Sequence, residues 1–329
     1  MTTRISYAQG ILDGFRYLLG SHKDVFAIGQ GLWSPWYVGA SMKDLDKDFG
    51  KDRVIDTPVS ELATTGAAIG ASLNGYRPIV IHPRLDFMIL AADQIVNQAA
   101  KWRHMLGGKS PAVTIRGIVN RGGEQGAQHS QALHSWYAHV PGLRVVMPAT
   151  AGDARDLLIA ATLCDDPVLY IDDRWCYEQT EEVAPAGPID LTRLGPLVRR
   201  EGKDITLVAA SYSTVLALEA AELLAKKGIS AEIVDLRVIN PLDHSMAASS
   251  VKKTGRLLAV DGGWATCGLA GETIAGVAER LAPSAFRARP RRITLPDAPA
   301  PTSKVLEEIY YPTAQQVADT AEAMVKETT

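Results

Sequence analysis

The feature that most constrains the fold is a repeated alternation of short apolar runs with stretches of helical periodicity. Runs such as 25–29, 78–81 and 168–171 have the composition of strands that are buried on both faces of a sheet. Strands that alternate with helices join into parallel sheets covered by helices. The sequence therefore predicts an α/β protein with two domains dominated by parallel sheets.

A stretch rich in proline, glycine and glutamate separates the two series of strands and helices. Such a composition is typical of a linker, and it covers residues 179–203. A chain of 329 residues is long enough for about two domains. We therefore expect one domain at 1–178, a linker at 179–203 and a second domain at 204–329.

Apolar periodicity also predicts the individual elements. Ser60 is the expected N-cap of the second helix. The expected helices are 6–19, 61–73, 87–105, 151–163, 213–227, 242–252, 268–281 and 313–326, and the expected strands are 25–29, 54–56, 78–81, 112–116, 143–148, 168–171, 205–210, 230–236, 256–260 and 290–295.

Charge and cysteine content argue against several classes of protein. The net charge is −3 and aromatic residues make up 6%, which disfavours a nucleic-acid surface or a basic membrane-binding patch. Cys164, Cys176 and Cys267 are too few and too scattered for a disulfide framework or a zinc site. No apolar run approaches the length of a membrane span, and the first residues lack the apolar core of a signal peptide. We expect a cytoplasmic protein that binds neither nucleic acid nor membrane.

Generic catalytic and nucleotide-binding motifs are missing. The glycine-rich segment 117–126 matches neither a dinucleotide turn nor a phosphate-binding loop, so close-packing turns are the better interpretation. The chain has no nucleophile elbow of the α/β-hydrolase type. Its histidines are not spaced to stack on one helix face with an acidic partner, so no metal site is predicted from them.

Three segments, taken together and in order, resemble a known family. They are 53–61 (RVIDTPVSE), 92–101 (ADQIVNQAAK) and 129–148, which contains HSQ and AHVPGLRVVMP. The set resembles the beta subunit of the thiamine-diphosphate-dependent decarboxylase of 2-oxo acid dehydrogenase complexes, with pyruvate dehydrogenase as the most familiar case. Beyond residue 204, the segments 204–209, 234–243 and 253–258 are similar to the transketolase C-terminal domain.

The resemblance implies a division of labour between two chains. The first domain is then the pyrimidine-binding domain for thiamine diphosphate, and the second is the transketolase C-terminal domain. The family's metal–diphosphate motif, Gly-Asp-Gly followed by Asn-Asn, is absent from this sequence. The resemblance therefore implies that an alpha subunit holds Mg²⁺ and the diphosphate in an α2β2 heterotetramer. A 2-oxo acid substrate and a lipoyl-bearing acyltransferase partner are also implied.

The resemblance also assigns roles to four residues. Glu61 matches the catalytic glutamate that binds the pyrimidine ring of the cofactor, although the same position suits a helix-start acid. Phe87 matches an aromatic residue that stacks on that ring, with a core phenylalanine as the alternative. Asp93 matches an acid near the cofactor or the subunit interface. His129 matches the histidine that faces the substrate or the lipoyl group.

Other positions depart from the family pattern. Gln30 and Gly31 stand where the family usually has an acidic pair, and His134 stands where many relatives have an acid. Arg84 lies near the expected cofactor site, where it would pair with an anionic substrate group or with a nearby acid. Backbone carbonyls near Arg116 are where relatives bind K⁺. These departures suggest an unusual acyl donor or acceptor.

Two alternatives remain open on the sequence. A split transketolase uses the same Glu61 chemistry to move a two-carbon unit between sugars, and Arg84 with the additional histidines fits sugar phosphates. A subunit that serves only assembly or regulation is the other alternative, against which Glu61, Phe87 and His129 argue. The segments 53–61 and 138–142 favour the oxo-acid enzyme.

Overall fold

The computed structural model describes residues 2–327, which form two compact units. Unit 1 contains the chain up to Arg121 together with Trp136–Leu194 and Ile239–Pro241. Unit 2 contains Gly122–Ser135, Gly195–Val238 and the chain from Leu242 onward. The segment that carries His129 and His134 therefore belongs to unit 2, although strands of unit 1 lie on both sides of it in the sequence.

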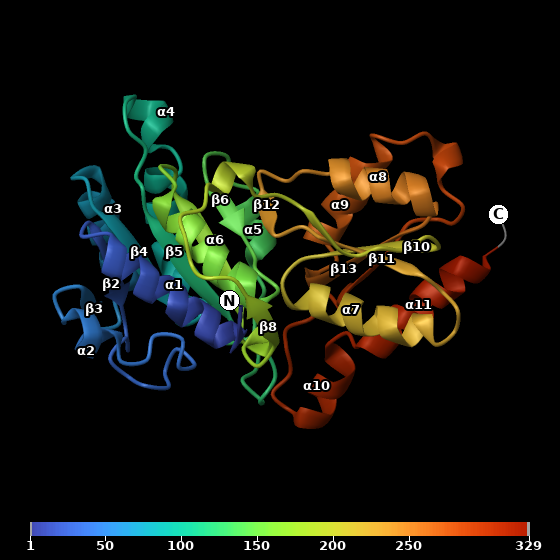
Figure 1. Ribbon diagram of the computed structural model, residues 1–329, viewed down its shortest axis with the longest axis horizontal. Coiled ribbons are helices and arrows are strands. Elements are labelled where there is room, and N and C mark those ends of the chain that lie inside the picture. Colours follow the sequence, from blue (N-terminus) through green and yellow to red (C-terminus); the bar gives the residue numbers. More distant parts are fainter. Residues whose placement is uncertain (1, 328–329) are drawn as a thin grey trace. The chain divides into compact units, whose positions relative to one another are not determined.

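Unit 1 is built on a seven-stranded sheet in the order β12-β6-β7-β5-β4-β2-β3 (Figure 1). Every pair between β6 and β3 is parallel, so the carboxyl ends of these strands meet at one edge of the sheet. The strands are β2 (Val25–Gly29), β3 (Val54–Asp56), β4 (Arg77–His82), β5 (Thr114–Val119), β6 (Arg144–Val146), β7 (Val168–Asp173) and β12 (Val238–Asn240).

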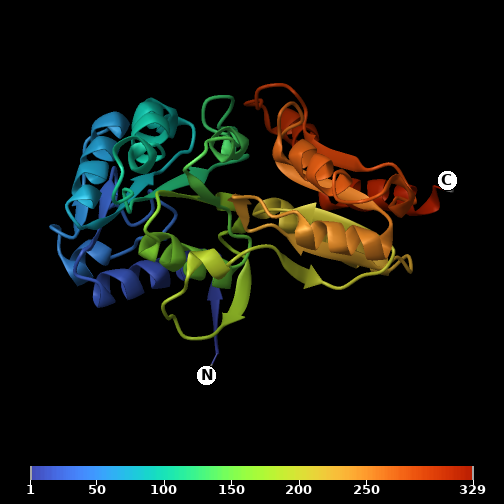
Figure 2. The same cartoon turned by 90° about the horizontal axis from the view of Figure 1, so that it is seen from above.

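Helices cover both faces of this sheet. Figure 2 shows α1 and α6 on one face and α3 on the other. Gly10 lets α1 lie close to α6, because a Cβ atom at this position would clash with the carbonyl oxygen of Ala151. The helices between residues 7 and 163 are α1 (Tyr7–Ser21), α2 (Leu45–Phe49), α3 (Glu61–Leu73), α4 (Trp102–Leu106), α5 (His134–Ala138) and α6 (Ala151–Leu163).

Three of the longer helices, α1, α6 and α11 (Ala314–Lys326), begin at a residue whose side chain caps the helix. Ser6 Oγ accepts a hydrogen bond from the backbone N–H of Gln9 (3.2 Å), and Gln9 Oε1 accepts one from the N–H of Ser6 (2.8 Å). Thr150 caps α6 in the same way through the N–H of Asp153. Ser60 occupies the N-cap position of α3 as predicted, but its side chain makes no capping hydrogen bond.

The predicted continuous helix at 87–105 is wrong. The segment contains a 3₁₀ turn η1 (Phe87–Ala91), a π-helical segment η2 (Gln94–Ala99) and the short α4. Apolar periodicity reports which side chains are buried, and it does not fix the spacing of the backbone hydrogen bonds. The other predicted strands and helices are present, with ends displaced by a few residues.

The segment 179–203 contains short paired strands. Within unit 1, β8 (Thr180–Val183) pairs with the N-terminal β1 (Thr3–Ser6) in antiparallel register. Two 3₁₀ turns lie near it, η3 (Arg174–Cys176) and η4 (Leu191–Arg193). In unit 2, β9 (Leu197–Arg200) pairs with β11. The domain boundaries expected at 178 and 204 stay a prediction.

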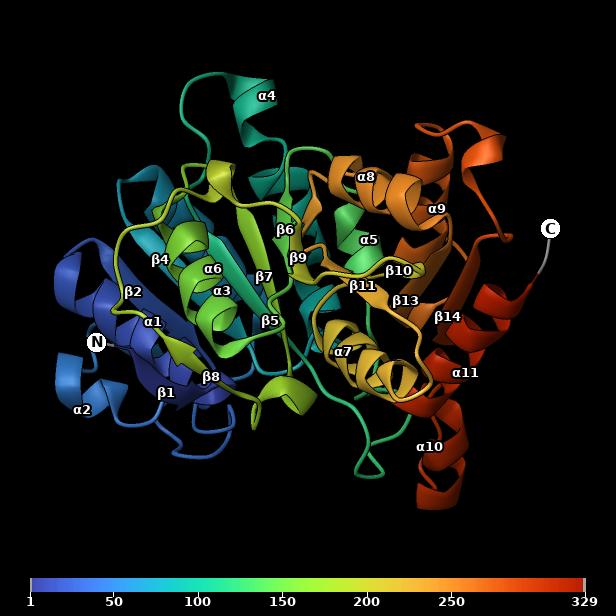
Figure 3. The same ribbon diagram turned by 45° about the vertical axis from the view of Figure 1, so that its right-hand side comes forward.

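Unit 2 is a five-stranded sheet in the order β14-β13-β10-β11-β9, parallel except for β9. Helices α7 and α11 share an apolar layer on one face, and α8 and α9 cover the other (Figure 3). The fold class predicted from the sequence is confirmed. The elements are β10 (Ile205–Ala209), β11 (Ala231–Asp235), β13 (Leu257–Trp264), β14 (Arg291–Leu295), α7 (Tyr212–Ala225), α8 (Ser245–Thr254), α9 (Leu269–Ala278), η5 (Pro283–Ala285), α10 (Lys304–Tyr310) and α11 (Ala314–Lys326).

Candidate active site

A small pocket lies in unit 1 at the carboxyl edge of the sheet. Open α/β sheets bind ligands at this edge, because the loops after successive strands converge there. The pocket is partly open to solvent, and the centre of a water molecule can occupy about 10 Å³ of it, which is room for about one water molecule. Its lining comes from the ends of β2, β3 and β4 and the first turn of α3, and consists of Gly29, Gln30, Thr57, Pro58, Ser60, Glu61, Thr64, Ile81, His82 and Pro83.

Glu61 is the first residue of α3 and lines this pocket. Its side chain is 8% exposed, and it forms no ion pair or side-chain hydrogen bond with another residue in the part of the chain that the structure describes. The N-terminus of a helix favours a negative charge at this position. A carboxyl that is buried at a pocket without a protein partner is available for a hydrogen bond to a ligand.

His82 is a second polar residue in the pocket, and no sequence motif identified it. It ends β4, and its Nε2 lies 3.1 Å from the hydroxyl of Thr65, one helical turn after Glu61. Burial lowers the pKa of His82 to about 4, so its ring is neutral near pH 7. The Thr65 contact fixes the start of α3 against the end of β4. Its position at the end of a parallel strand was the only clue available.

Gln30 follows β2 and connects the pocket to the aromatic loop after it. Its Nε2 donates to the Tyr37 hydroxyl (3.1 Å). The Tyr37 ring lies against Gly31, whose φ of +71° and crowded α-carbon both exclude a larger residue. Trp33 and Trp36 in the same loop are exposed.

The remaining predicted residues of unit 1 lie outside the pocket lining. Arg84 is half-buried and follows β4. Phe87 begins η1 and is half-buried. Asp93 is exposed and accepts a hydrogen bond from the Asn97 side chain (2.8 Å). In the described chain, therefore, the structure brings Glu61 together with Gln30 and His82 in this pocket, and does not place Phe87 or Asp93 among its lining residues.

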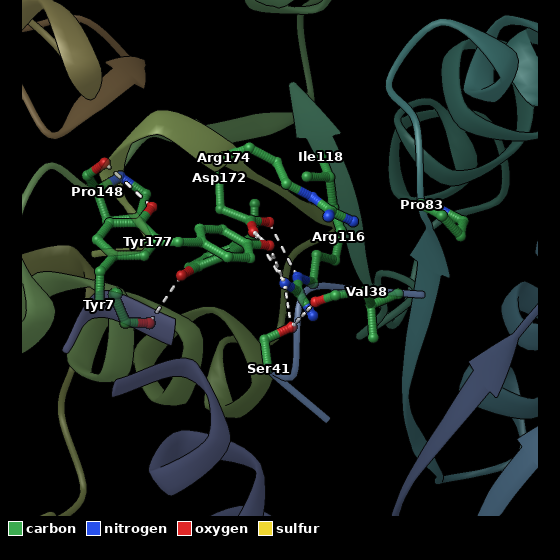
Figure 4. Close-up of polar contacts among 12 residues, drawn as sticks. Tyr7, Val38, Ser41, Pro83, Arg116, Ile118, Pro148, Asp172, Arg174 and Tyr177 are labelled. Atoms are coloured by element: carbon green, nitrogen blue, oxygen red, sulfur yellow. Dashed lines mark hydrogen bonds and ion pairs between the residues drawn. The ribbon is translucent and has the colours of Figure 1, made fainter. Parts of the chain in front are cut away.

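Arg116 lies in a fully buried ionic cluster within unit 1 (Figure 4). Its Nε and Nη2 donate to the two carboxylate oxygens of Asp172 at 2.9 and 2.8 Å. Its Nη2 also contacts the hydroxyl oxygens of Ser41 and Tyr177, and the Tyr177 hydroxyl donates to Asp172. Asp172 raises the pKa of the Arg116 guanidinium, and burial opposes that shift. The cluster ties the loop carrying Ser41 to β5 and β7.

The two histidines of segment 122–135 lie in unit 2 and differ in setting. His129 is half-buried in a turn, where its backbone N–H donates to the carbonyl of Gly126 (3.3 Å). His134 is buried and its Nε2 lies 2.9 Å from the Asp261 carboxylate. Burial raises the pKa of the Asp261 carboxyl. The neighbouring His134 ring helps to outweigh that effect, so the pKa of Asp261 is lowered overall. Asp261 thus anchors His134, which gives this histidine a structural role.

Metal and thiol chemistry have no evident centre in the described chain. Residues 2–327 contain no group of three or more His, Cys, Asp or Glu side chains that could hold a metal ion. Cys164, Cys176 and Cys267 are free thiols. None of the helices between residues 2 and 327 is both long and apolar enough to cross a membrane.

Two family descriptions match most of the chain. Residues 3–176 match the transketolase pyrimidine-binding domain, and residues 196–317 match the transketolase C-terminal domain. A solved structure described as a split-gene transketolase in an inactive beta4 tetramer superposes with a TM-score of 0.79. It covers 99% of both chains at 23% identity, a similarity that establishes the fold.

Curated relatives are similar over most of their length. The beta subunit of acetoin:2,6-dichlorophenolindophenol oxidoreductase from Cupriavidus necator is 44% identical over 276 residues, which is 84% of this chain and 81% of the relative. The corresponding Bacillus subtilis subunit is 39% identical over 84% of this chain and 80% of the relative. The pyruvate dehydrogenase E1 beta subunit of Rhizobium meliloti is 36% identical over 96% of this chain and 69% of the relative.

Proposed function

This chain belongs to the transketolase-type family that contains the beta subunits of pyruvate dehydrogenase E1 and of acetoin oxidoreductase, and we propose that it works as such a beta subunit. In this proposal it forms an α2β2 heterotetramer with an alpha subunit. The assembled enzyme depends on thiamine diphosphate, decarboxylates a 2-oxo acid and transfers the acyl unit to a lipoyl group carried by an acyltransferase.

The observation that carries the proposal is the setting of Glu61. A carboxyl at a helix start, 8% exposed and without an ion-pair partner among the described residues, is costly unless a ligand hydrogen-bonds to it. The aminopyrimidine ring of the cofactor offers a ring nitrogen that shares a proton with a carboxyl. Glu61 would hold that proton at its carboxyl oxygen, as general acid–base chemistry requires.

When bound, thiamine diphosphate would supply an acidic carbon that, once deprotonated, is the nucleophile for the carbonyl group of a 2-oxo acid. The residues of this chain position Glu61 for that chemistry. The contact between Thr65 and His82 fixes the first turn of α3, and the neutral His82 ring places no second charge beside Glu61. Gly29 lets the end of β2 lie close to β4, because a Cβ atom at this position would lie 2.5 Å from the carbonyl oxygen of Ile81.

The size of the pocket supports a site shared with another chain. The pocket has room for about one water molecule, which is less than a pyrimidine ring requires. We infer that the ring rests at the mouth of the pocket, with the alpha subunit holding the diphosphate and Mg²⁺. In the same proposal Phe87 stacks on the ring, Asp93 supports the cofactor or the interface, and His129 faces the substrate or the lipoyl group.

Two further expectations belong to this proposal. The first is a K⁺ ion bound by backbone carbonyls near Arg116. We therefore expect KCl to raise the thermal midpoint of unfolding more than NaCl does. A cytoplasmic location is the other, and subcellular fractionation tests it. Either can fail without changing the assignment of Glu61.

Calorimetric titration with thiamine diphosphate and Mg²⁺ tests the shared site. We expect tight binding by this chain after co-purification with an alpha subunit that carries the metal–diphosphate motif, and no tight binding by this chain alone. Tight binding by the single chain would refute the shared site. Binding by neither sample, with assembly intact, would favour a non-catalytic subunit.

Glu61→Gln tests the catalytic role. In the assembled enzyme we expect it to abolish 2-oxo acid decarboxylation, measured with an artificial electron acceptor, while assembly is unchanged. Glu178→Gln is the matched control, because Glu178 is exposed and lies outside the pocket. Full activity of the Glu61 variant would refute the assignment. Ketol transfer between sugars without oxo-acid turnover would identify a split transketolase instead.

A further inference from the structure

The two acidic side chains at the end of β7 already pair with arginines. Asp172 accepts two hydrogen bonds from Arg116, and Asp173 lies 2.7 Å from Nε of Arg121. All four side chains are buried. These carboxylates therefore have little capacity to neutralise further cations at this edge of the sheet.

Arg84 is an additional cation at the same edge. It follows β4 by two residues, is half-buried, and forms no hydrogen bond or ion pair with another residue in the described chain. Burial and the nearby Arg174 guanidinium both lower the pKa of Arg84, and they outweigh the opposite effects of Tyr37 and Asp86. A half-buried arginine beside a like charge is stabilised when an anion is bound.

Arg174 follows β7, and the strand register brings it to the level of Arg84. Strand β4 pairs His82 with Gly117, and β7 pairs Asp173 with Val119, so both chains emerge on either side of the end of β5. The Nη2 of Arg174 donates to the Tyr37 carbonyl (2.7 Å), and its guanidinium lies over the Tyr177 ring. Its Nε is buried and makes no hydrogen bond to the described residues.

Tyr37 connects Arg174 to the Glu61 pocket. Its carbonyl holds Arg174, and its hydroxyl accepts from Gln30, which lines the pocket together with Glu61. Gln30 brings no negative charge to this connection. An elongated ligand that reaches from the pocket along Tyr37 would meet two guanidinium groups and no unpaired carboxylate other than Glu61 among the pocket-lining residues.

We propose that Arg84 and Arg174 together bind a second anionic group of the acyl donor, a group that the donor keeps after decarboxylation. The inference rests on the proposed function and adds the substrate class: 2-oxo acids with a distal carboxylate, phosphonate or sulfonate. A strong ionic contact to the carboxylate that leaves as CO₂ would stabilise the ground state and slow the reaction. A pair of arginines suits an anion that is retained throughout.

The first test measures binding without turnover. Glutarate, 3-phosphonopropionate and pentanoate are titrated into the alpha–beta complex without thiamine diphosphate. We expect glutarate or 3-phosphonopropionate to bind at least about tenfold more tightly than pentanoate, and Arg84→Gln or Arg174→Gln to remove that difference. The tighter of the two dianions identifies the distal group. Arg103→Gln is the matched control, because Arg103 lies in α4, away from the carboxyl edge.

The second test compares two donors of equal length in the assembled enzyme, 2-oxoglutarate and 2-oxopentanoate. We expect kcat/KM to favour 2-oxoglutarate at least about tenfold, and Arg84→Gln or Arg174→Gln to reduce that preference to about twofold through KM. The control Arg103→Gln should retain the preference.

Three outcomes would overturn the inference. They are equal binding of glutarate, 3-phosphonopropionate and pentanoate by the unmodified complex, unchanged selectivity in both arginine variants, or arginine variants that only weaken assembly with the alpha subunit. Arginine-dependent binding of a dianion by a complex that turns over no 2-oxo acid would leave the inference standing and refute the proposed function. The two proposals therefore fail separately.

Discussion

Asp172→Asn provides the most direct test of how unit 1 is held together. The Asp172 carboxylate and the Arg116 side chain are 0% exposed, and Tyr177 completes the cluster from the chain after β7. The substitution keeps the size of the side chain and removes its charge. Arg116 would then be a buried cation without a counter-ion, since its other hydrogen-bond partners, Ser41 and Tyr177, are neutral.

The magnitude follows from that geometry. Removing one partner of a buried ion pair costs about 3–5 kcal/mol, because the remaining charge stays desolvated. Tyr177→Phe removes hydrogen bonds but leaves the ion pair, so its expected cost is about 1–3 kcal/mol. For a unit of this size, each 1 kcal/mol lowers the thermal midpoint by about 2–4 °C. Asp172→Asn should therefore lower it by roughly 6–20 °C, and Tyr177→Phe by less.

Tryptophan fluorescence during thermal and urea unfolding measures this effect in the correct unit. All tryptophans except Trp264 lie in unit 1, so the signal reports mainly on that unit. Asp165→Asn is the control, because the Asp165 side chain is 88% exposed and its ion pair with Arg77 is expected to contribute below about 1 kcal/mol. A loss for Asp172→Asn no larger than that of the control would refute the reasoning.

Three other substitutions test the pocket and the turns. The pKa of His82 is about 4 in the folded chain and about 6.5 in the unfolded chain, so the unfolded state binds more protons between these pH values. The free energy of unfolding therefore decreases by roughly 3 kcal/mol as the pH falls from about 6.5 to 4. His82→Gln should flatten that pH dependence in urea titrations, and an unchanged slope would contradict the burial argument. Gly142→Ala should destabilise by several kcal/mol, because φ is +91° and a Cβ atom would clash with the carbonyl of Ala100. Gly75→Ala, with φ of +93° and open space around it, should cost only about 1 kcal/mol, and equal midpoints for the two glycine variants would show that the contact with Ala100 contributes nothing.

The sequence predicted the fold well because both sheets are buried on two faces. Strands such as 25–29 and 168–171 are then continuous apolar runs, and the helices between them keep one apolar face. The prediction of one continuous helix at 87–105 was wrong because tertiary contacts determine the backbone conformation of this segment. Leu85 and Met88 pack against Gly117, where a Cβ atom would lie 2.7 Å from Leu85 Cδ1. Periodicity carries no information on such a contact.

The pocket was only partly predictable. Glu61 was identified through its flanking motif, whereas neither His82 nor Arg174 belongs to any motif that the sequence displayed. Both lie at the carboxyl end of a parallel strand: His82 is the last residue of β4, and Arg174 follows the last residue of β7. The order of the strands is needed before these positions become neighbours, and that order depends on contacts between residues far apart in the chain.

The charges at this edge of the sheet explain how one fold accepts different acyl donors. Among the pocket-lining residues Glu61 is the only carboxylate, because Gln30 is neutral and the pKa of His82 keeps its ring uncharged near pH 7. A second acid there would repel an anionic donor, and Arg84 beside Arg174 attracts one. Strand ends can change in this way without altering the packed sheet beneath them. In the proposed function, substrate choice would follow from the residues after β2, β4 and β7, while Glu61 at the start of α3 would retain the proton chemistry.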